Sequence, residues 1–153
     1  PGDRVFASSS YGVGCALFQV GHEAGAWSID RTWKRMTLKA KFTNTVLHEG
    51  FIYGLDESVL VCLDPETGRR RWKKGRYGHG QVLLVPPWLL VVAESGEVAL
   101  VEASPDQLVE RARFQAITGK TWNHPALAGR FLLVRNDREA ACYELPVEED
   151  SGG

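Results

Sequence analysis

Three short segments of the sequence hold the side chains best suited to bind a ligand: KAKFTN, RYGHG and KTWNHP. Their aromatic, amide and imidazole groups suit a planar polar ligand or a peptide segment, provided that the three segments lie together in the fold. In the alternative interpretation, glycine and proline shape these loops and the side chains only hold the backbone in place. The candidate binding residues are Lys41, Asn44, Tyr77, His79, Lys120, Trp122, Asn123 and His124.

No set of residues in the sequence predicts catalysis or metal binding. The three segments contain no Asp or Glu, and the acidic residues, such as Asp56, are expected mainly in outer turns. The serines of SSSYG lack a GxSxG context, and GVG is not followed by a predicted helix. The side chains of the adjacent pairs His22–Glu23 and His48–Glu49 would point apart on a strand. We therefore predict no catalytic residues and no metal ligands.

Three cysteines, Cys15, Cys62 and Cys142, lie far apart in the sequence. An odd number of cysteines without a CxxC pair argues against both a disulfide framework and a zinc site. Cys62 and Cys142 each lie in an apolar stretch, so both are predicted to be small buried side chains.

The overall composition is that of a soluble globular protein with one core: 153 residues, 44% hydrophobic, 24% charged and a net charge of -1. This balance indicates no nucleic-acid partner. The basic stretch RRRWKKGR is interpreted as protecting an edge strand from pairing with other strands. No apolar run approaches the roughly 20 residues of a membrane helix, and the first residues show no signal-peptide pattern.

Short apolar strands separated by Gly, Pro, Asp and Ser predict an all-β protein. Four of these strands have their leading apolar residues at Val5, Phe51, Leu89 and Phe131, 38 to 46 positions apart. About four antiparallel strands in each unit of roughly 40 residues is typical of a β-propeller blade. We predict about four blades over residues 1–145, with three, four, four and three strands. SPDQLVERARF is predicted as a turn followed by a strand.

The segment CLDPETGRRRW predicts a tight turn between the third and fourth strands of a blade. Pro65 presets φ, the Asp64 side chain accepts backbone N–H bonds and Gly68 tolerates positive φ. The turn therefore places Trp72 on the outer strand, where the ring can wedge against the next blade and contribute on the order of 2–3 kcal/mol through burial. The predicted docking residues are Asp64, Thr67, Gly68, Trp72 and Trp33, with Phe114 at the equivalent place in the third unit.

The pattern Cys-x-Asp-x-x-Thr-Gly-Arg-x-x-Trp over 62–72 resembles the tryptophan-docking motif of quinoprotein-type propellers, in which Ala and Lys usually replace Cys62 and Arg69. FIYGLDESVLVCLD, GRYGHGQVLL and TWNHPALAGRFLLVRN resemble bacterial propeller repeats of the pyrroloquinoline-quinone-binding-like (PQQ-like) family. The resemblance covers nearly the whole chain and implies a propeller fold and a periplasmic or otherwise extracytoplasmic location. Dehydrogenases of this type hold PQQ and Ca²⁺ with converging carboxylates and amides and use an Asp as base. The candidate loops here offer no such carboxylates.

Family members commonly close seven or eight blades, so the resemblance implies that this chain is the C-terminal part of a larger propeller. Its uncovered faces would then pack against the remaining blades or a second copy of the chain. Residues 146–153 are expected to form a flexible acidic tail. We predict a non-catalytic scaffold or binding module that presents blade-joining loops to a protein or small ligand, without a cofactor. The alternative is part of a PQQ-dependent dehydrogenase whose catalytic residues lie mainly outside this segment.

Overall fold

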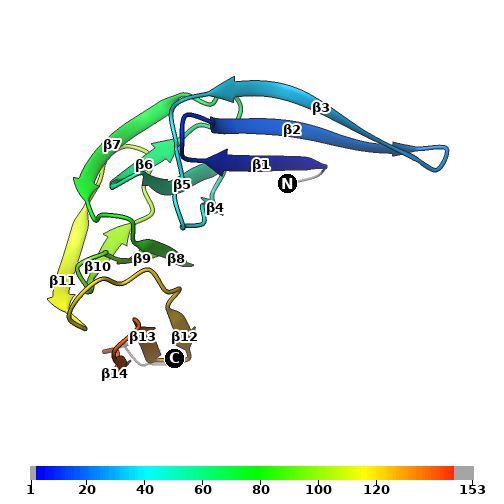
Figure 1. Cartoon of the computed structure of the whole chain (residues 1–153). Coiled ribbons are helices and arrows are strands. Elements are labelled where there is room, and N and C mark those ends of the chain that lie inside the picture. Colours follow the sequence, from blue (N-terminus) through cyan, green and yellow to red (C-terminus); the bar gives the residue numbers. More distant parts are fainter. Residues whose placement is uncertain (1–2, 147–153) are drawn as a thin grey trace, which may run out of the picture.

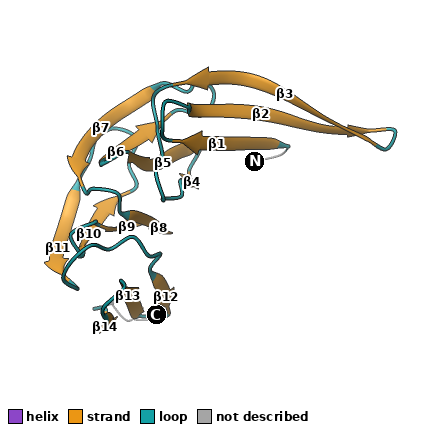
Figure 2. Cartoon of the chain, viewed as in Figure 1, coloured by secondary structure: helices purple, strands orange, loops and turns teal. Residues whose placement is uncertain are grey.

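The computed structural model describes residues 3–146, so nearly all of the predicted acidic tail lies outside the described residues. Fourteen strands and no helix are found in this part of the chain. The strands form four antiparallel sheets of three, four, four and three strands, and none of the sheets closes on itself (Figures 1 and 2). The predicted all-β class and the predicted number of strands in each sheet are confirmed.

The first two sheets are built from strands that pair with their neighbours in sequence. The first sheet contains β1 (Arg4–Ser9), β2 (Gly14–Glu23) and β3 (Ala26–Arg35). The second contains β4 (Val46–His48), β5 (Phe51–Asp56), β6 (Val59–Leu63) and β7 (Arg70–Arg76). Sequential antiparallel pairing needs only short connections, which the Gly- and Asp-containing turns supply.

The last two sheets repeat this order. The third contains β8 (Gln81–Val85), β9 (Trp88–Val92), β10 (Glu97–Glu102) and β11 (Glu110–Gln115). The fourth contains β12 (Ala126–Ala128), β13 (Phe131–Arg135) and β14 (Ala140–Glu144). β11 is the strand predicted within SPDQLVERARF, and it is confirmed. In Figure 1 the four sheets follow one another along an arc, with β7 and β11 on its outer side.

The hydrophobic core lies between successive sheets, in three clusters. Period-2 alternation along each central strand sends one set of side chains to each face, so a sheet contributes to the cluster before it and to the one after it. Leu17 of the first sheet meets Val61 of the second, and Leu60 of the second shares a cluster with Val91 of the third. Val92 of the third sheet packs in the cluster that contains Leu132 of the fourth.

One tryptophan on the outer strand of each of the first two sheets connects that sheet to the next one. Trp33 on β3 is 8% exposed and donates its indole N–H to the Pro65 carbonyl at 2.8 Å. Trp72 on β7 is 7% exposed and donates to the Ser104 carbonyl at 2.9 Å. Both acceptors belong to the loop between the third and fourth strands of the following sheet. At the third junction Phe114 instead meets Tyr143 edge to face, with ring centroids 5.0 Å apart.

The turn after β6 has the predicted hydrogen bonds and an additional role. Asp64 accepts the backbone N–H of Glu66 at 2.8 Å and the Thr67 hydroxyl at 3.0 Å, and Gly68 has φ of 66°. A Cβ at Gly68 would lie 2.7 Å from the ring of Trp33. The turn was predicted to position Trp72, the tryptophan that follows it. The structure shows that it also receives the indole of the preceding sheet.

The β2–β3 hairpin is longer than the sequence indicated and projects from the first sheet (Figure 1). A β-bulge at Leu17/Phe18 shifts the register, so that Trp33 faces the second sheet. Beyond the bulge, His22 and Trp27 are cross-strand partners and their rings lie 4.4 Å apart. Trp27 is 73% exposed, so this indole contributes little burial to the fold.

Candidate functional site

The loops that carry the predicted binding residues all lie along one side of the array of sheets. The loops that lead into the second, third and fourth sheets are each hydrogen-bonded to a hairpin turn. For the second and third sheets this is the turn between the second and third strands of the same sheet, and for the fourth it is the equivalent turn of the third sheet. The backbone N–H of Glu57 donates to the Lys39 carbonyl at 3.0 Å, and that of Glu94 donates to the Tyr77 carbonyl at 2.8 Å. The backbone N–H of Thr121 donates to the Glu94 carbonyl at 2.9 Å. We call this surface the loop face, defined by residues 10–13, 37–45, 56–57, 77–81, 93–96 and 116–125.

Acidic side chains from the hairpin turns anchor these loops. The carboxylate of Asp56 accepts the backbone N–H of Lys39 at 3.0 Å, and that of Glu94 accepts the N–H of His79 at 3.1 Å. Glu139 accepts the N–H of Thr118 in the fourth sheet. Asp56 was expected in an outer turn, but its carboxylate instead binds the loop that enters the second sheet. Antiparallel pairing returns the β5–β6 turn to the same edge of the sheet as the incoming loop.

Gln81, at the start of β8, connects the loops on either side of it. This residue is fully buried, and its amide nitrogen donates to the carbonyls of Phe42 at 2.5 Å and Trp122 at 2.8 Å. The rings of Phe42 and Trp122 lie in contact, with centroids 5.1 Å apart. Phe42 has φ of 60°, an uncommon conformation for a residue with a side chain, and the bond from Gln81 helps to hold it there.

Two lysines lie beside this aromatic pair. The Lys41 ammonium is 5.3 Å from the ring centroid of Tyr11 and 5.5 Å from that of Phe42, while Lys120 lies 4.7 Å from the Trp122 ring. The rings remain accessible, with exposed fractions of 74% for Tyr11, 53% for Phe42 and 38% for Trp122. These contacts form a continuous line of rings and ammonium groups, which we call the aromatic row: Tyr11, Lys41, Phe42, Trp122 and Lys120.

Glu94 lies next to the row and is already engaged with it. Its carboxylate accepts the Trp122 indole N–H at 2.9 Å as well as the His79 backbone N–H. Burial acts to raise the pKa of this carboxyl, but the two N–H donors and the nearby charge of Lys120 outweigh burial and hold the pKa below its ordinary value. Glu94 is therefore ionised at neutral pH and fixes the orientation of the indole.

A second cluster on the loop face is an ion-pair network around Asp56. This carboxylate is 2% exposed and pairs with Lys73, and with Lys39 at 3.5 Å. Lys39 also reaches Glu57 at 3.6 Å, and the Glu57 carbonyl lies 2.9 Å from His79 Nδ1. Because these charges satisfy one another, the cluster holds the loop from β3 to β4 against the second sheet.

The structure divides the predicted binding residues into two groups. Lys41, Lys120 and Trp122 belong to the aromatic row, and His79 lies close to it through Glu94. Tyr77 is 2% exposed and donates its hydroxyl to Glu110 at 2.8 Å, so it packs between sheets. His124 lies instead on the outward face of the fourth sheet, in a hollow lined with Leu133 and Cys142. Asn44 is exposed and Asn123 half-buried, outside the row's contacts.

Sequence reasoning missed Tyr11, Phe42, Gln81 and Glu94. One signal was present: Phe42, Tyr77 and Trp122 each stand four residues before the first strand of a sheet. That regular spacing marks aromatic positions on equivalent loops. Gln81 and Glu94 carried no comparable signal, because their roles depend on contacts with residues 28 to 41 positions away.

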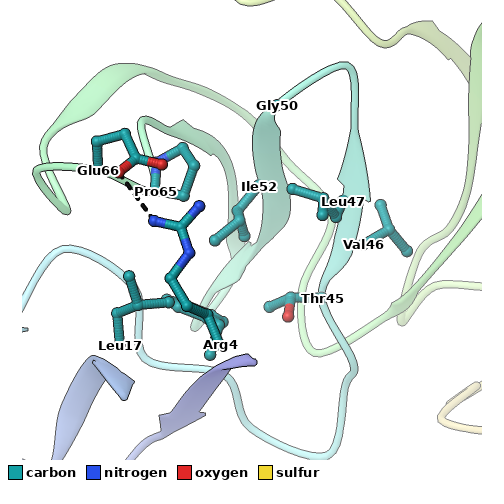
Figure 3. A pocket seen from close by; sticks show the side chains of 10 residues that line it. Arg4, Leu17, Thr45, Val46, Leu47, Gly50, Ile52, Pro65 and Glu66 are labelled. Carbon is teal, nitrogen blue, oxygen red and sulfur yellow. Dashed lines mark hydrogen bonds and ion pairs between the residues drawn. The ribbon is translucent and has the colours of Figure 1, made fainter. Parts of the chain in front are cut away.

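A separate hollow of about 310 Å³ lies at the junction of the first two sheets (Figure 3). Arg4 and Glu66 pair at 2.8 Å beside it, and Leu17 and Ile52 supply apolar lining. This hydrogen bond and the attraction of the two charges hold the pKa of Glu66 below its ordinary value. The hollow does not include any of the predicted binding residues.

The remaining candidate chemistry is limited. Cys15 and Cys62 are buried, and burial raises the pKa of the Cys62 thiol to about 11; Cys142 is exposed, so its predicted burial is wrong. Its alternation on β14 points it to the outward face of the fourth sheet. Within residues 3–146, no three His, Cys, Asp or Glu side chains are grouped to hold a metal ion. The same residues contain no helix with the length and apolar character needed to cross a membrane.

A scan against protein-family models and a search of curated proteins gave no match to this chain.

Proposed function

We propose that the four sheets are consecutive blades of a β-propeller and that the chain is a non-catalytic binding module whose ligand contacts the loop face. The repeated sheet order and the repeated docking of Trp33 and Trp72 on the following sheet support the propeller. One observation carries the binding role: Gln81 holds the loops of Phe42 and Trp122 together while both rings remain exposed. Exposed rings on a fixed backbone are typical of binding surfaces, because their ordering costs little further entropy.

The proposed propeller also explains the apolar residues on the outward faces of the first and last sheets. Val5 is 51% exposed on β1, and Phe131 and Leu133 are 46% and 47% exposed on β13. Further blades, or a second copy of the chain, would cover these faces as the inner sheets cover one another. Sedimentation of the chain over a range of concentrations distinguishes the two, because only the second copy gives a concentration-dependent dimer.

The binding role is tested by selecting peptides from a displayed random library against the chain. Selected peptides should lose about tenfold or more in affinity for Trp122→Ala, because the indole would be a central contact. Trp27→Ala, which removes an exposed indole on the β2–β3 hairpin, is the matched control and should leave affinity unchanged. Binding that is equal for both variants, with circular dichroism showing that both remain folded, would contradict the proposal.

The non-catalytic part of the proposal has its own test. The full-length protein is titrated with PQQ and Ca²⁺ in the presence of an alcohol or a sugar. We expect no oxidation of the substrate. Saturable PQQ binding accompanied by oxidation would replace the scaffold with the dehydrogenase alternative.

A further inference from the structure

The aromatic row is an open surface. Tyr11 and Phe42 are each more than half exposed, and Trp122 is 38% exposed. Sites for small molecules usually enclose most of the ligand surface, which a row of this exposure does not do. Its contacts join a hairpin turn of the first sheet to the loop that enters the fourth sheet. Successive groups in the row lie 4.7 to 5.5 Å apart, so its length corresponds to at most about six residues of an extended peptide.

The row has an excess of positive charge. Neither Lys41 nor Lys120 lies within 4.0 Å of a carboxylate oxygen in residues 3–146. Glu94 is engaged by the N–H groups of Trp122 and His79, and Asp56 is engaged by Lys39 and Lys73. Both ammonium groups therefore lie over aromatic rings and outside ion-pair distance of the carboxylates in this part of the chain, with the charge of Glu94 acting on Lys120 from farther away. A ligand carboxylate can pair with either lysine without breaking an existing ion pair.

From this combination we propose that the loop face binds an acidic peptide segment, whose carboxylates pair with Lys41 and Lys120 and whose apolar side chains pack on Phe42 and Trp122. This inference rests on the proposed binding function. Charge complementarity supplies orientation and a faster association rate, and the rings supply the buried apolar area. The ammonium groups already lie over ring faces, so little reorganisation is needed when a carboxylate arrives.

The same observations favour a peptide over a nucleic acid. A nucleic-acid site typically neutralises several phosphates with several Lys or Arg side chains. The row offers two ammonium groups, the Glu94 carboxylate lies beside it, and the whole chain has a net charge of -1. Two cations set along a row of rings match a segment with a few acidic residues better than they match a continuous polyanion.

The test uses the displayed random library and reads the charge of the selected peptides. Peptides that depend on Trp122 should be enriched in Asp and Glu over the starting library. Lys41→Gln combined with Lys120→Gln should weaken their binding about fivefold or more. The control pair, Lys34→Gln with Lys74→Gln, removes the same charge from exposed positions on β3 and β7 and should leave binding within about twofold. Raising NaCl from about 50 to about 300 mM should weaken binding severalfold, because salt screens exposed charges.

The possible outcomes separate this inference from the proposed function. Neutral or basic peptides that still depend on Trp122 would overturn the acidic-segment proposal and leave the binding module standing. If no selected peptide depends on Trp122, both proposals fall. A 12-nucleotide oligothymidine that competes for the same site and binds more tightly than the peptides would overturn the proposal in favour of a nucleic acid.

Discussion

Three of the five tryptophans donate an indole N–H bond to a group from another sheet, in two different settings. Trp33 and Trp72 donate their indole N–H to backbone carbonyls of the next sheet and are at most 8% exposed. Trp122 also donates to a group from another sheet, but its acceptor is the Glu94 carboxylate and its ring is 38% exposed. The difference lies in the surroundings of the ring: sheet faces enclose the first two, whereas loops hold the third at the surface.

The two settings suit different roles: a buried ring stabilises the fold, and a surface ring is free to contact a partner. Burying an aromatic ring between two sheets removes a large apolar area from water, which stabilises the fold. A ring held at the surface contributes little to folding and remains available to a partner. The acceptors also differ in their response to pH. The Glu94 carboxylate that binds Trp122 can be protonated, whereas the backbone carbonyls that bind Trp33 and Trp72 cannot.

The largest expected effect is at the junction between sheets. Trp72→Ala should lower the free energy of unfolding by about 3–5 kcal/mol, because it leaves a cavity between the second and third sheets and leaves the Ser104 carbonyl without its donor. Urea unfolding followed by circular dichroism measures this loss. Trp27→Ala on the exposed face of the β2–β3 hairpin should change stability by no more than about 0.5 kcal/mol. Equal losses in the two variants would remove the distinction between buried and surface indoles.

A smaller effect is expected where the turn receives an indole. Gly68→Ala should destabilise by about 2–4 kcal/mol, because φ is positive and the new Cβ would lie 2.7 Å from the Trp33 ring. Gly12→Ala is the matched control: its φ is 81°, but a Cβ there meets nothing within 4 Å, so only about 1–2 kcal/mol should be lost. Thermal unfolding of the two variants measures the difference. If they lose the same stability, close packing of Trp33 on the turn is not the cause.

The smallest effect is a pH response confined to the loop face. The folded-state pKa of Glu94 is lowered, so its interactions stabilise the fold above the ordinary carboxyl pKa and are lost as the pH falls through the lowered value. The indole N–H resonance of Trp122 should shift in this acidic range, below about pH 4.5. The resonances of Trp33 and Trp72 should not follow the same titration, because their acceptors are carbonyls.

Glu94→Gln tests the assignment of this titration. Since the amide does not ionise, the Trp122 resonance should lose its pH dependence in the variant, while the Trp33 and Trp72 resonances should be the same as in the unmodified chain. A Trp122 shift that persists in Glu94→Gln would mean that another group controls the indole.

Much of the fold could be predicted because its signals are local. Period-2 alternation in strands such as β5 and β9, and the turn chemistry of Asp64 and Gly68, depend on residues close in sequence. The length of the β2–β3 hairpin could not be read in this way. Its outer part has little burial, and a β-bulge at Leu17/Phe18 changes the face on which each later side chain lies.

The candidate site was predicted in part. Trp122 and Lys41 were identified by type and loop position, while Tyr77 has the same position in its loop and is buried by Glu110 and Arg113. Residue type and spacing cannot distinguish these two outcomes. Whether an aromatic ring at this point faces the solvent depends on which neighbouring strand reaches it.

The sequence by itself determined the all-β class, the order of the strands and the tight turn of Asp64 and Gly68 that precedes Trp72. These properties follow from backbone preferences and from alternation over a few residues, which any window of the chain contains. The tertiary structure alone decided that Gln81 joins the loops of Phe42 and Trp122 and that Glu94 fixes an indole 28 residues away. Such contacts arise only when separate sheets pack together, because packing brings distant loops within the 3 Å reach of a hydrogen bond.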